Sequence, residues 1–294
     1  MRAPARLASF VAVLAAVFGG AALAGGAIDP DGAEAGRSPH AAQAEAEAGH
    51  GGGGHASTGH AAGAASAPEA TALPGLAVAQ DGHRLELAAP TLDRGAKERL
   101  RFRIVDGEGR PVRSFDEAHE KRMHLIVVRR DLEHFQHLHP EISADGTWTA
   151  DVDVRDGGTY RVFADFTRDG RQRTLGADVH VPGRFTPRAV PAAASTAQDD
   201  RGLEVRLRRD GDRVAFDVLR DGRTVNAELE PYLGAKGHLV TLRAGDLAYL
   251  HTHPDGDRLA FETELPTAGR YRMWVQFQLD GRVHTAAFTQ EVTA

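Results

Sequence analysis

Six histidines of this chain form two sets with the same spacing, and neutral imidazole is a common ligand of transition-metal ions. The first set is His124, His137 and His139, and the second is His238, His251 and His253. Each set lies in one of two segments that align without a gap, HLIVVRRDLEHFQHLHP and HLVTLRAGDLAYLHTHP. The first histidine of the set starts the segment, and the other two stand just before its final proline. Repetition of three metal-ligating side chains predicts one metal site in each half of the chain.

Each set lies on a predicted β-hairpin, because two apolar runs flank a charged turn. If the first turn is centred between Asp131 and Leu132, His124 lies opposite His139 and diagonal to His137, within reach of one ion. The same register opposes His238 and His253 in the second segment. The rest of this face is apolar, which predicts that the imidazoles lie at one end of a sandwich, where its core meets solvent. A shift of register by one residue would leave only the His-x-His pair together.

A structural role is the alternative for these residues, since a histidine at a strand end often bonds to a loop carbonyl and duplication would copy it. Repetition of the complete set favours metal. Asp165 aligns with Gln276 and is at best an accessory ligand in the first half. The remaining histidines of the folded part have no counterpart in the other half and are predicted to be surface or loop residues: His83, His119, His134, His180 and His284.

The ligand type suits Cu(II), Zn(II) and Ni(II), whereas Cu(I) carriers depend on methionine and cysteine. The chain contains no cysteine and only three methionines, and Met123 is predicted to point away from the His124 face. Cu(II) is the first choice by affinity order and Zn(II) the second. The absence of cysteine also excludes disulfides and thiolate sites.

Composition indicates a soluble globular protein of two domains, with 294 residues, 41% hydrophobic residues and a net charge of −6. No basic block points to nucleic acid as a partner. Arg2 and Arg6 precede an apolar run that ends in Ala22-Leu23-Ala24, which predicts a secretory signal peptide over residues 1–24. An uncleaved membrane anchor is the alternative. Both place the protein outside the cytoplasm, at the cell surface or secreted.

Residues 25–74 are rich in Ala, Gly, Ser and His and contain almost no large apolar side chain, which predicts a disordered tether that is dispensable for folding. Weaker, loosely held metal ligands are expected from the histidines of this tether. They are His40, His50, His55 and His60.

Short strands with turn signals and no convincing helix predict an all-β fold, two tandem Ig-like or cupredoxin-like β-sandwiches. Leu100, Phe102 and Ile104 alternate with arginines as in a half-buried strand. The sandwiches are predicted over residues 75–183 and 199–294, joined by a Pro/Ala-rich linker over residues 184–198. An Asp-Gly turn lies three residues after Phe166 and again after Phe277, which indicates tandem copies of one domain.

The segments HLIVVRRDLEHFQHLHP, GTYRVFADF and EPYLGAKGHLV resemble a group of uncharacterised secreted proteins of high-GC bacteria, labelled heavy-metal-associated or YtkA-like. The similarity covers both domains from about Leu76 onward. It implies an extracytoplasmic location and an association with metal rather than a mechanism. The architecture is also similar to copper-carrying sandwiches, but the chain departs from their methionine-containing motifs, which argues against a Cu(I) handover role.

The leading hypothesis is an extracytoplasmic protein that binds divalent metal, copper first, and buffers it or delivers it to an envelope transporter or acceptor protein. It is not expected to be an enzyme. The alternative is a structural or protein-interaction module of a cell-envelope complex. A weaker alternative is a zinc hydrolase with three histidine ligands, for which no repeated Asp or Glu beside the hairpins supplies a base.

Overall fold

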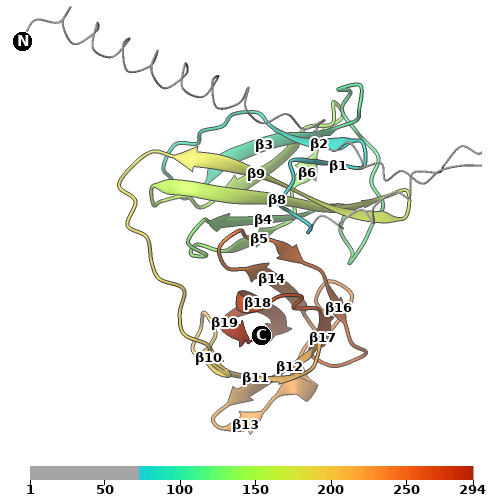
Figure 1. The fold of residues 1–294 in the computed structure, drawn as a ribbon. Helices are drawn as coiled ribbons and strands as arrows, with labels where there is room; N and C mark the ends of the chain where they lie inside the picture. The colour runs from blue at the N-terminus through green and yellow to red at the C-terminus, as the bar shows by residue number, and fades with distance from the viewer. Residues whose placement is uncertain (1–72, 294) are drawn as a thin grey trace, which may run out of the picture. The chain divides into compact units, whose positions relative to one another are not determined.

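Antiparallel β-strands form two sandwiches in tandem, as predicted (Figure 1). In this computed structural model, the structure describes residues 73–293. The predicted signal peptide and nearly all of the tether lie outside this range. The first sandwich contains β1 (Ala79–Gln80), β2 (His83–Leu87), β3 (Glu98–Val105), β4 (His124–Arg129), β5 (Gln136–Leu138), β6 (Glu141–Ile142), β7 (Trp148–Val152), β8 (Gly158–Arg168) and β9 (Arg171–Val181).

The second sandwich repeats these strands in the same order, with β13 and a 3-10 turn added after the third. It contains β10 (Thr196–Gln198), β11 (Glu204–Asp210), β12 (Arg213–Arg220), β13 (Arg223–Thr224), the 3-10 turn η1 (Asn226–Glu228), β14 (His238–Arg243), β15 (Tyr249–Leu250), β16 (Thr252–Pro254), β17 (Ala260–Thr263), β18 (Gly269–Leu279) and β19 (Arg282–Val292).

Each sandwich packs one sheet of four strands against a larger sheet. The first has orders β5-β4-β8-β9 and β1-β2-β3-β7-β6. The second has orders β15-β14-β18-β19 and β10-β11-β12-β17-β16, with β13 paired to β12. Equivalent strands occupy equivalent places, so the duplication seen in the sequence is a duplication of the whole sandwich.

Alternation of apolar and charged residues explains the larger sheets. In β3, Leu100, Phe102 and Ile104 are buried and the arginines between them are exposed, as predicted. The predicted Asp-Gly turns connect long hairpins. At the Asp169-Gly170 turn φ is 52° and 68°, and at Asp280-Gly281 it is 52° and 67°, the conformation that a two-residue hairpin requires.

A tyrosine near the start of β8 and of β18 supports the Ig-like assignment. The Tyr160 hydroxyl donates to the Asp156 carbonyl at 2.9 Å, and the Tyr271 hydroxyl donates to the Thr267 carbonyl at 2.7 Å. This is the tyrosine corner of Ig-type sandwiches, in which the hydroxyl bonds back to the turn before the strand. Both copies keep it.

The four-stranded sheets have a second apolar face, and these faces pack against each other within the unit formed by residues 66–294. Ile126 and Val128 of β4 meet Val240 and Leu242 of β14 in a cluster separate from either sandwich core. Every residue of β4 is buried because both faces of its sheet are covered. The prediction that the imidazoles of this face lie at one end of a sandwich, where its core meets solvent, is therefore wrong, because the face itself is covered. It forms the contact between the two.

The described chain begins against this contact. The backbone N–H of Tyr249 donates to the Pro74 carbonyl at 2.9 Å, and the Gly75 N–H donates to Thr174 at 2.9 Å. A Cβ at Gly75 would come within 2.9 Å of both Phe163 and Tyr249, so only glycine fits between them. Between the two sandwiches, β10 begins at Thr196, so its three residues lie inside the linker predicted over residues 184–198. No helix of residues 73–293 is long and apolar enough to cross a membrane.

A chain that begins at Leu73 is expected to keep the β-type circular dichroism and the melting midpoint of the full chain, because every buried residue of both cores is retained. As a matched comparison, a chain that begins at Leu76 loses the three hydrogen bonds made by residues 74 and 75, two to backbone groups and one from Arg161 to the Gly75 carbonyl. Its free energy of unfolding is expected to be about 1–3 kcal/mol lower. Loss of a cooperative melt in the chain from Leu73 would contradict the assigned start of the fold.

Candidate metal centre

The first hairpin has the predicted register. Leu125 pairs with Leu138 and Ile126 with His137, which places His139 beside His124 at the start of β4. The ring centroids are 5.3 Å apart for His124 and His137, 5.1 Å for His124 and His139, and 4.8 Å for His137 and His139. The three imidazoles of the first set therefore lie together on one face of the hairpin.

His238 from the second sandwich completes this group. Its ring lies parallel to that of His124, with an interplanar angle of 3° and centroids 5.3 Å apart, and its centroid is 4.6 Å from that of His137. Ligand nitrogens of His124, His137 and His238 all lie within 4.8 Å of one another. The structure thus forms a single site between the sandwiches, where the sequence predicted one site in each. We call His119, His124, His137, His139 and His238 the interface cluster.

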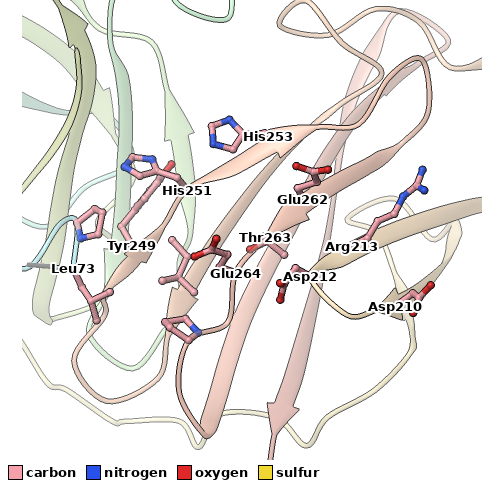
Figure 2. A pocket seen from close by; sticks show the side chains of 13 residues that line it. Leu73, Asp210, Asp212, Arg213, Tyr249, His251, His253, Glu262, Thr263 and Glu264 are labelled. Atoms are coloured by element: carbon pink, nitrogen blue, oxygen red, sulfur yellow. The ribbon is translucent and has the colours of Figure 1, made fainter. Parts of the chain in front are cut away.

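His251 and His253 do not join His238, although β14 and β15 have the predicted register, with Leu242 opposite Tyr249. After Leu250 the chain leaves this sheet, and His253 pairs with Glu262 of β17 in the other sheet. His251 and His253 instead line a pocket (Figure 2). The exit comes earlier than in the first copy, where Leu138 still pairs with Leu125; the equivalent residue in the second copy is Thr252. Its hydroxyl donates to the Leu239 carbonyl at 2.6 Å, whereas Leu138 packs on the apolar core.

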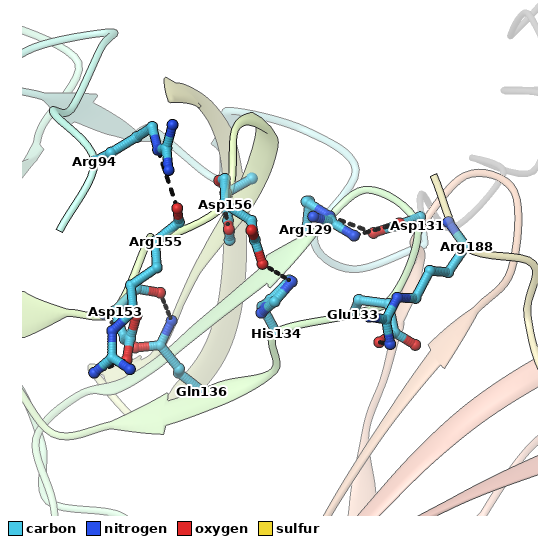
Figure 3. Close-up of polar contacts among 11 residues, drawn as sticks. Arg94, Arg129, Asp131, Glu133, His134, Gln136, Asp153, Arg155, Asp156 and Arg188 are labelled. Atoms are coloured by element: carbon cyan, nitrogen blue, oxygen red, sulfur yellow. Dashed lines mark hydrogen bonds and ion pairs between the residues drawn. The ribbon is translucent and has the colours of Figure 1, made fainter. Parts of the chain in front are cut away.

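Polar contacts fix the hairpin that carries His124 and His137 (Figure 3). Arg129 forms two bonds of 2.8 Å with Asp131 in the turn, and both side chains are buried. Gln136 exchanges two hydrogen bonds with the backbone of Asp153, at 2.8 and 2.7 Å. These bonds hold β5 in register at the residue that precedes His137.

His119 lies in a loop, as predicted, but it also belongs to the interface cluster, which the sequence did not indicate. Its ring centroid is 6.0 Å from those of His124 and His238. His119 and Glu120 form a two-residue turn with φ values of 50° and 62°, closed by hydrogen bonds between Ala118 and Lys121. Non-glycine residues adopt this conformation at a cost. The equivalent residue of the second copy is Leu233, so comparison of the repeats could not reveal it.

His124 and His137 each use one ring nitrogen as a hydrogen-bond donor to another group. Their other two ring nitrogens carry no proton and face each other. Nε2 of His124 donates to the Ala118 carbonyl at 3.1 Å, and Nδ1 of His137 donates to Oε1 of Gln276 at 2.6 Å. A neutral imidazole carries one N–H, so Nδ1 of His124 and Nε2 of His137 both present lone pairs. These two nitrogens are 3.0 Å apart. A metal ion about 2 Å from each would subtend about 95° between them, a normal ligand angle.

Burial favours the neutral form of four histidines of the cluster. Burial lowers the pKa of His137 to about 3, with further effects from His124 and His139, and it lowers the pKa of His139 to about 4. Burial also lowers the pKa of His124, and that of His238 well below its usual value. Nε2 of His139 and Nε2 of His238 are buried without a hydrogen-bond partner. Neutral, unpaired imidazole nitrogens in a dry site are the form that binds a metal ion.

The other histidines have local explanations or lie outside the described residues. His134 bonds to Asp156 at 3.0 Å, and His180 is exposed on β9. His284, predicted to be a surface or loop residue, is buried in β19, with Nδ1 2.6 Å from Asp199. Asp199 also accepts the N–H groups of Arg201 and Leu203. This pair therefore ties a turn to β19. The tether residues His40, His50, His55 and His60 are outside residues 73–293.

The family described as "Domain of unknown function (DUF8832)" matches residues 77–183 and 200–294. No match was found among curated proteins. A two-domain fibronectin type III segment of chicken tenascin is 12% identical over 71% of this chain and 97% of its own, with a TM-score of 0.21. InvD of Yersinia pseudotuberculosis is 14% identical over 73% and 58%, with a TM-score of 0.25. The Escherichia coli adhesin FdeC is 13% identical over 74% and 66%, with a TM-score of 0.27.

The lowered pKa values of His137 and His139 predict that metal-free protein loses stability as the pH falls. The pKa values of His137 and His139 lie below the ordinary value of 6.5 in the folded state, so below pH 6.5 the unfolded chain binds more protons. Between about pH 6.5 and 4, each should lower the free energy of unfolding by about 1.4 kcal/mol per pH unit. Urea unfolding with a chelator present, at several pH values, measures the slope.

His137→Gln isolates this effect, because carboxylates that also titrate below pH 5 are common to both proteins. The variant is expected to show a slope smaller by about 1.4 kcal/mol per pH unit. Equal slopes in the two proteins would contradict a neutral, buried His137.

Proposed function

We propose that this chain, which belongs to the DUF8832 family, binds one divalent transition-metal ion between its two sandwiches and buffers or delivers that ion outside the cytoplasm. One observation carries the proposal. Nδ1 of His124 and Nε2 of His137 face each other at 3.0 Å, with their partner nitrogens already donating to Ala118 and Gln276. Two lone pairs at this distance repel unless a proton or a metal ion lies between them, and burial disfavours the proton.

The ligands favour Cu(II) first and Zn(II) second, since imidazole suits both and Cu(II) leads the affinity order. His124, His137 and His238 supply three nitrogens, and His139 lies next to them as a fourth candidate. Met123 and Met273 are buried in the sandwich cores, so neither thioether is offered to an ion. This argues against Cu(I) as the ion.

The cellular role rests on sequence. The signal peptide expected over residues 1–24 and the resemblance to heavy-metal-associated, YtkA-like proteins of high-GC bacteria support an extracytoplasmic location. The partner would be an envelope metal transporter or acceptor protein. The group that binds the ion contains only histidine, which offers no carboxylate as a general base and disfavours a zinc hydrolase.

A structural or interaction module is the second candidate, and the fold supports it. Tandem Ig-like sandwiches fit such a role, and stacked rings can join two sheets without any ion. In this case the parallel rings of His124 and His238 contribute only packing at the contact. The two candidates differ in whether added metal stabilises the fold.

Metal is expected to stabilise a full-length chain in which His40, His50, His55 and His60 are replaced by serine, so that the tether cannot bind the ion. A hundredfold excess of Cu(II) over the dissociation constant adds about 2.7 kcal/mol to the free energy of unfolding and raises Tm. Scanning calorimetry at pH 7.5 measures the change. The gain is expected to fade as the pH falls, because protons compete for the same nitrogens.

His238→Ala is expected to abolish this gain as completely as His137→Ala, because one ion takes ligands from both sandwiches. His180→Ala, which removes an exposed histidine of β9, is the matched control and should keep the full gain. A Tm indifferent to Cu(II), Zn(II) and Ni(II) at neutral pH would leave the cluster a purely structural role. A gain that survives His238→Ala would place the ion in the first sandwich alone.

A further inference from the structure

We infer that His251, His253 and the buried Asp165 form a second, more open site for a divalent cation. The site lies at the contact between the sandwiches, where His251 is the residue of the second copy equivalent to His137. The inference rests on the proposed function, since it extends the same metal chemistry to the other half of the duplicated fold. It gives a role to the two repeated histidines that the interface cluster leaves out.

The contact between the sandwiches is nearly symmetric. Phe135 of the first sandwich stacks on Trp274 of the second, with centroids 4.4 Å apart, and the equivalent pair, Tyr249 and Phe163, lies at 5.6 Å. Each contact between the sandwiches thus has an equivalent in which the two sandwiches exchange places, as at the interface of a two-fold symmetric dimer.

This relation places Asp165 where Gln276 stands in the other half. Asp165 pairs with His124 across β4 and β8, and Gln276 pairs with His238 across β14 and β18. Gln276 bonds to His137 across the contact. The symmetric counterpart of this pair is Asp165 and His251, which make no hydrogen bond with each other in the described residues. Burial lowers the pKa of His251, and the Asp165 carboxylate opposes that effect, as a close neighbour does.

Asp165 is a buried carboxylate without a cationic partner. It is 6% exposed and accepts hydrogen bonds from Thr174 at 2.9 Å and from Gln172 at 3.2 Å, both neutral donors. Among residues 73–293 it makes no ion pair. A buried charge of this kind is costly unless an opposite charge compensates it. A divalent cation held by His251 would supply that charge.

A pocket of about 840 Å³ gives His251 and His253 access to solvent (Figure 2). Four carboxylates line the pocket, and its one cationic side chain forms an ion pair with a further carboxylate next to the pocket. The carboxylates are Asp210, Asp212, Glu262 and Glu264, and the pair is Arg213 with Asp255. The pocket is therefore net negative and concentrates cations. Thr263, also in its wall, has a buried hydroxyl without a hydrogen-bond partner.

The two sites differ in chemistry and in strength. The interface cluster offers nitrogen ligands that already converge within 4.8 Å, whereas the His251 group is not among the clusters that converge this closely in the described chain. An ion there keeps part of its water and gains an oxygen ligand from Asp165. Its affinity is expected to be lower, and its Cu(II) spectrum should show mixed nitrogen and oxygen ligation.

The test is a Cu(II) titration of the full chain with the four tether histidines replaced by serine. Calorimetry counts the ions, and electron paramagnetic resonance identifies their ligands. Two ions are expected, the second bound about tenfold or more weakly. His251→Ala with His253→Ala should remove only the weaker ion, Asp165→Asn should weaken it about tenfold, and His137→Ala should remove only the tighter one. His180→Ala, the matched control, should bind both.

Each other outcome has a distinct meaning. Absence of any bound Cu(II) overturns the proposed function together with the second site. One bound ion, unaffected by the loss of His251 and His253, overturns the second site and leaves the proposed function standing. A second ion that survives those substitutions also overturns it. If the double variant fails to fold, His253→Ala alone decides, because His253 is exposed and should weaken the second ion without changing Tm.

Discussion

The constraint on which this molecule depends is the burial of two apolar sheet faces against each other. Each four-stranded sheet has one face in its own core and a second apolar face, and only the other sandwich covers that second face. The stacked pair Phe135 and Trp274 lies in this contact. Water is thereby excluded from the ends of β4 and β14, where His124 and His238 stand. The site exists only because the two sandwiches dock.

Exclusion of water leaves the facing imidazoles of His124 and His137 in the neutral form that the proposed metal binding requires. Desolvation disfavours imidazolium, so the facing nitrogens of His124 and His137 remain unprotonated and repel each other across 3.0 Å. An ion would turn this repulsion into two bonds. Because His238 comes from the other sandwich, an ion bound there would also strengthen the docking, so that metal affinity and docking are linked.

The duplication placed three histidines at equivalent positions of the two hairpins, and small differences in sequence accompany their different surroundings. Leu138 continues the first hairpin into the core, so His139 stays beside His124, whereas Thr252 bonds to the backbone and His253 follows the chain into the other sheet. Asp165 and Gln276 occupy equivalent places but differ in charge. The result is one closed cluster of imidazoles and one open pocket lined by carboxylates.

Local sequence determined the strands, the Asp-Gly turns, the duplication and the register of the first hairpin, because these follow from side-chain alternation and turn chemistry within a few residues. The unbroken apolar run from Leu125 to Val128 was the signal that β4 is covered on both faces. The sequence does not identify the surface that covers β4. It also does not predict that His119 and His238 lie beside His124. The contact of His238 with His124 joins residues far apart in the chain, and only the packing of one sandwich on the other decides it. His119 is brought to His124 by the tight turn between Ala118 and Lys121, whose conformation is unusual for residues other than glycine.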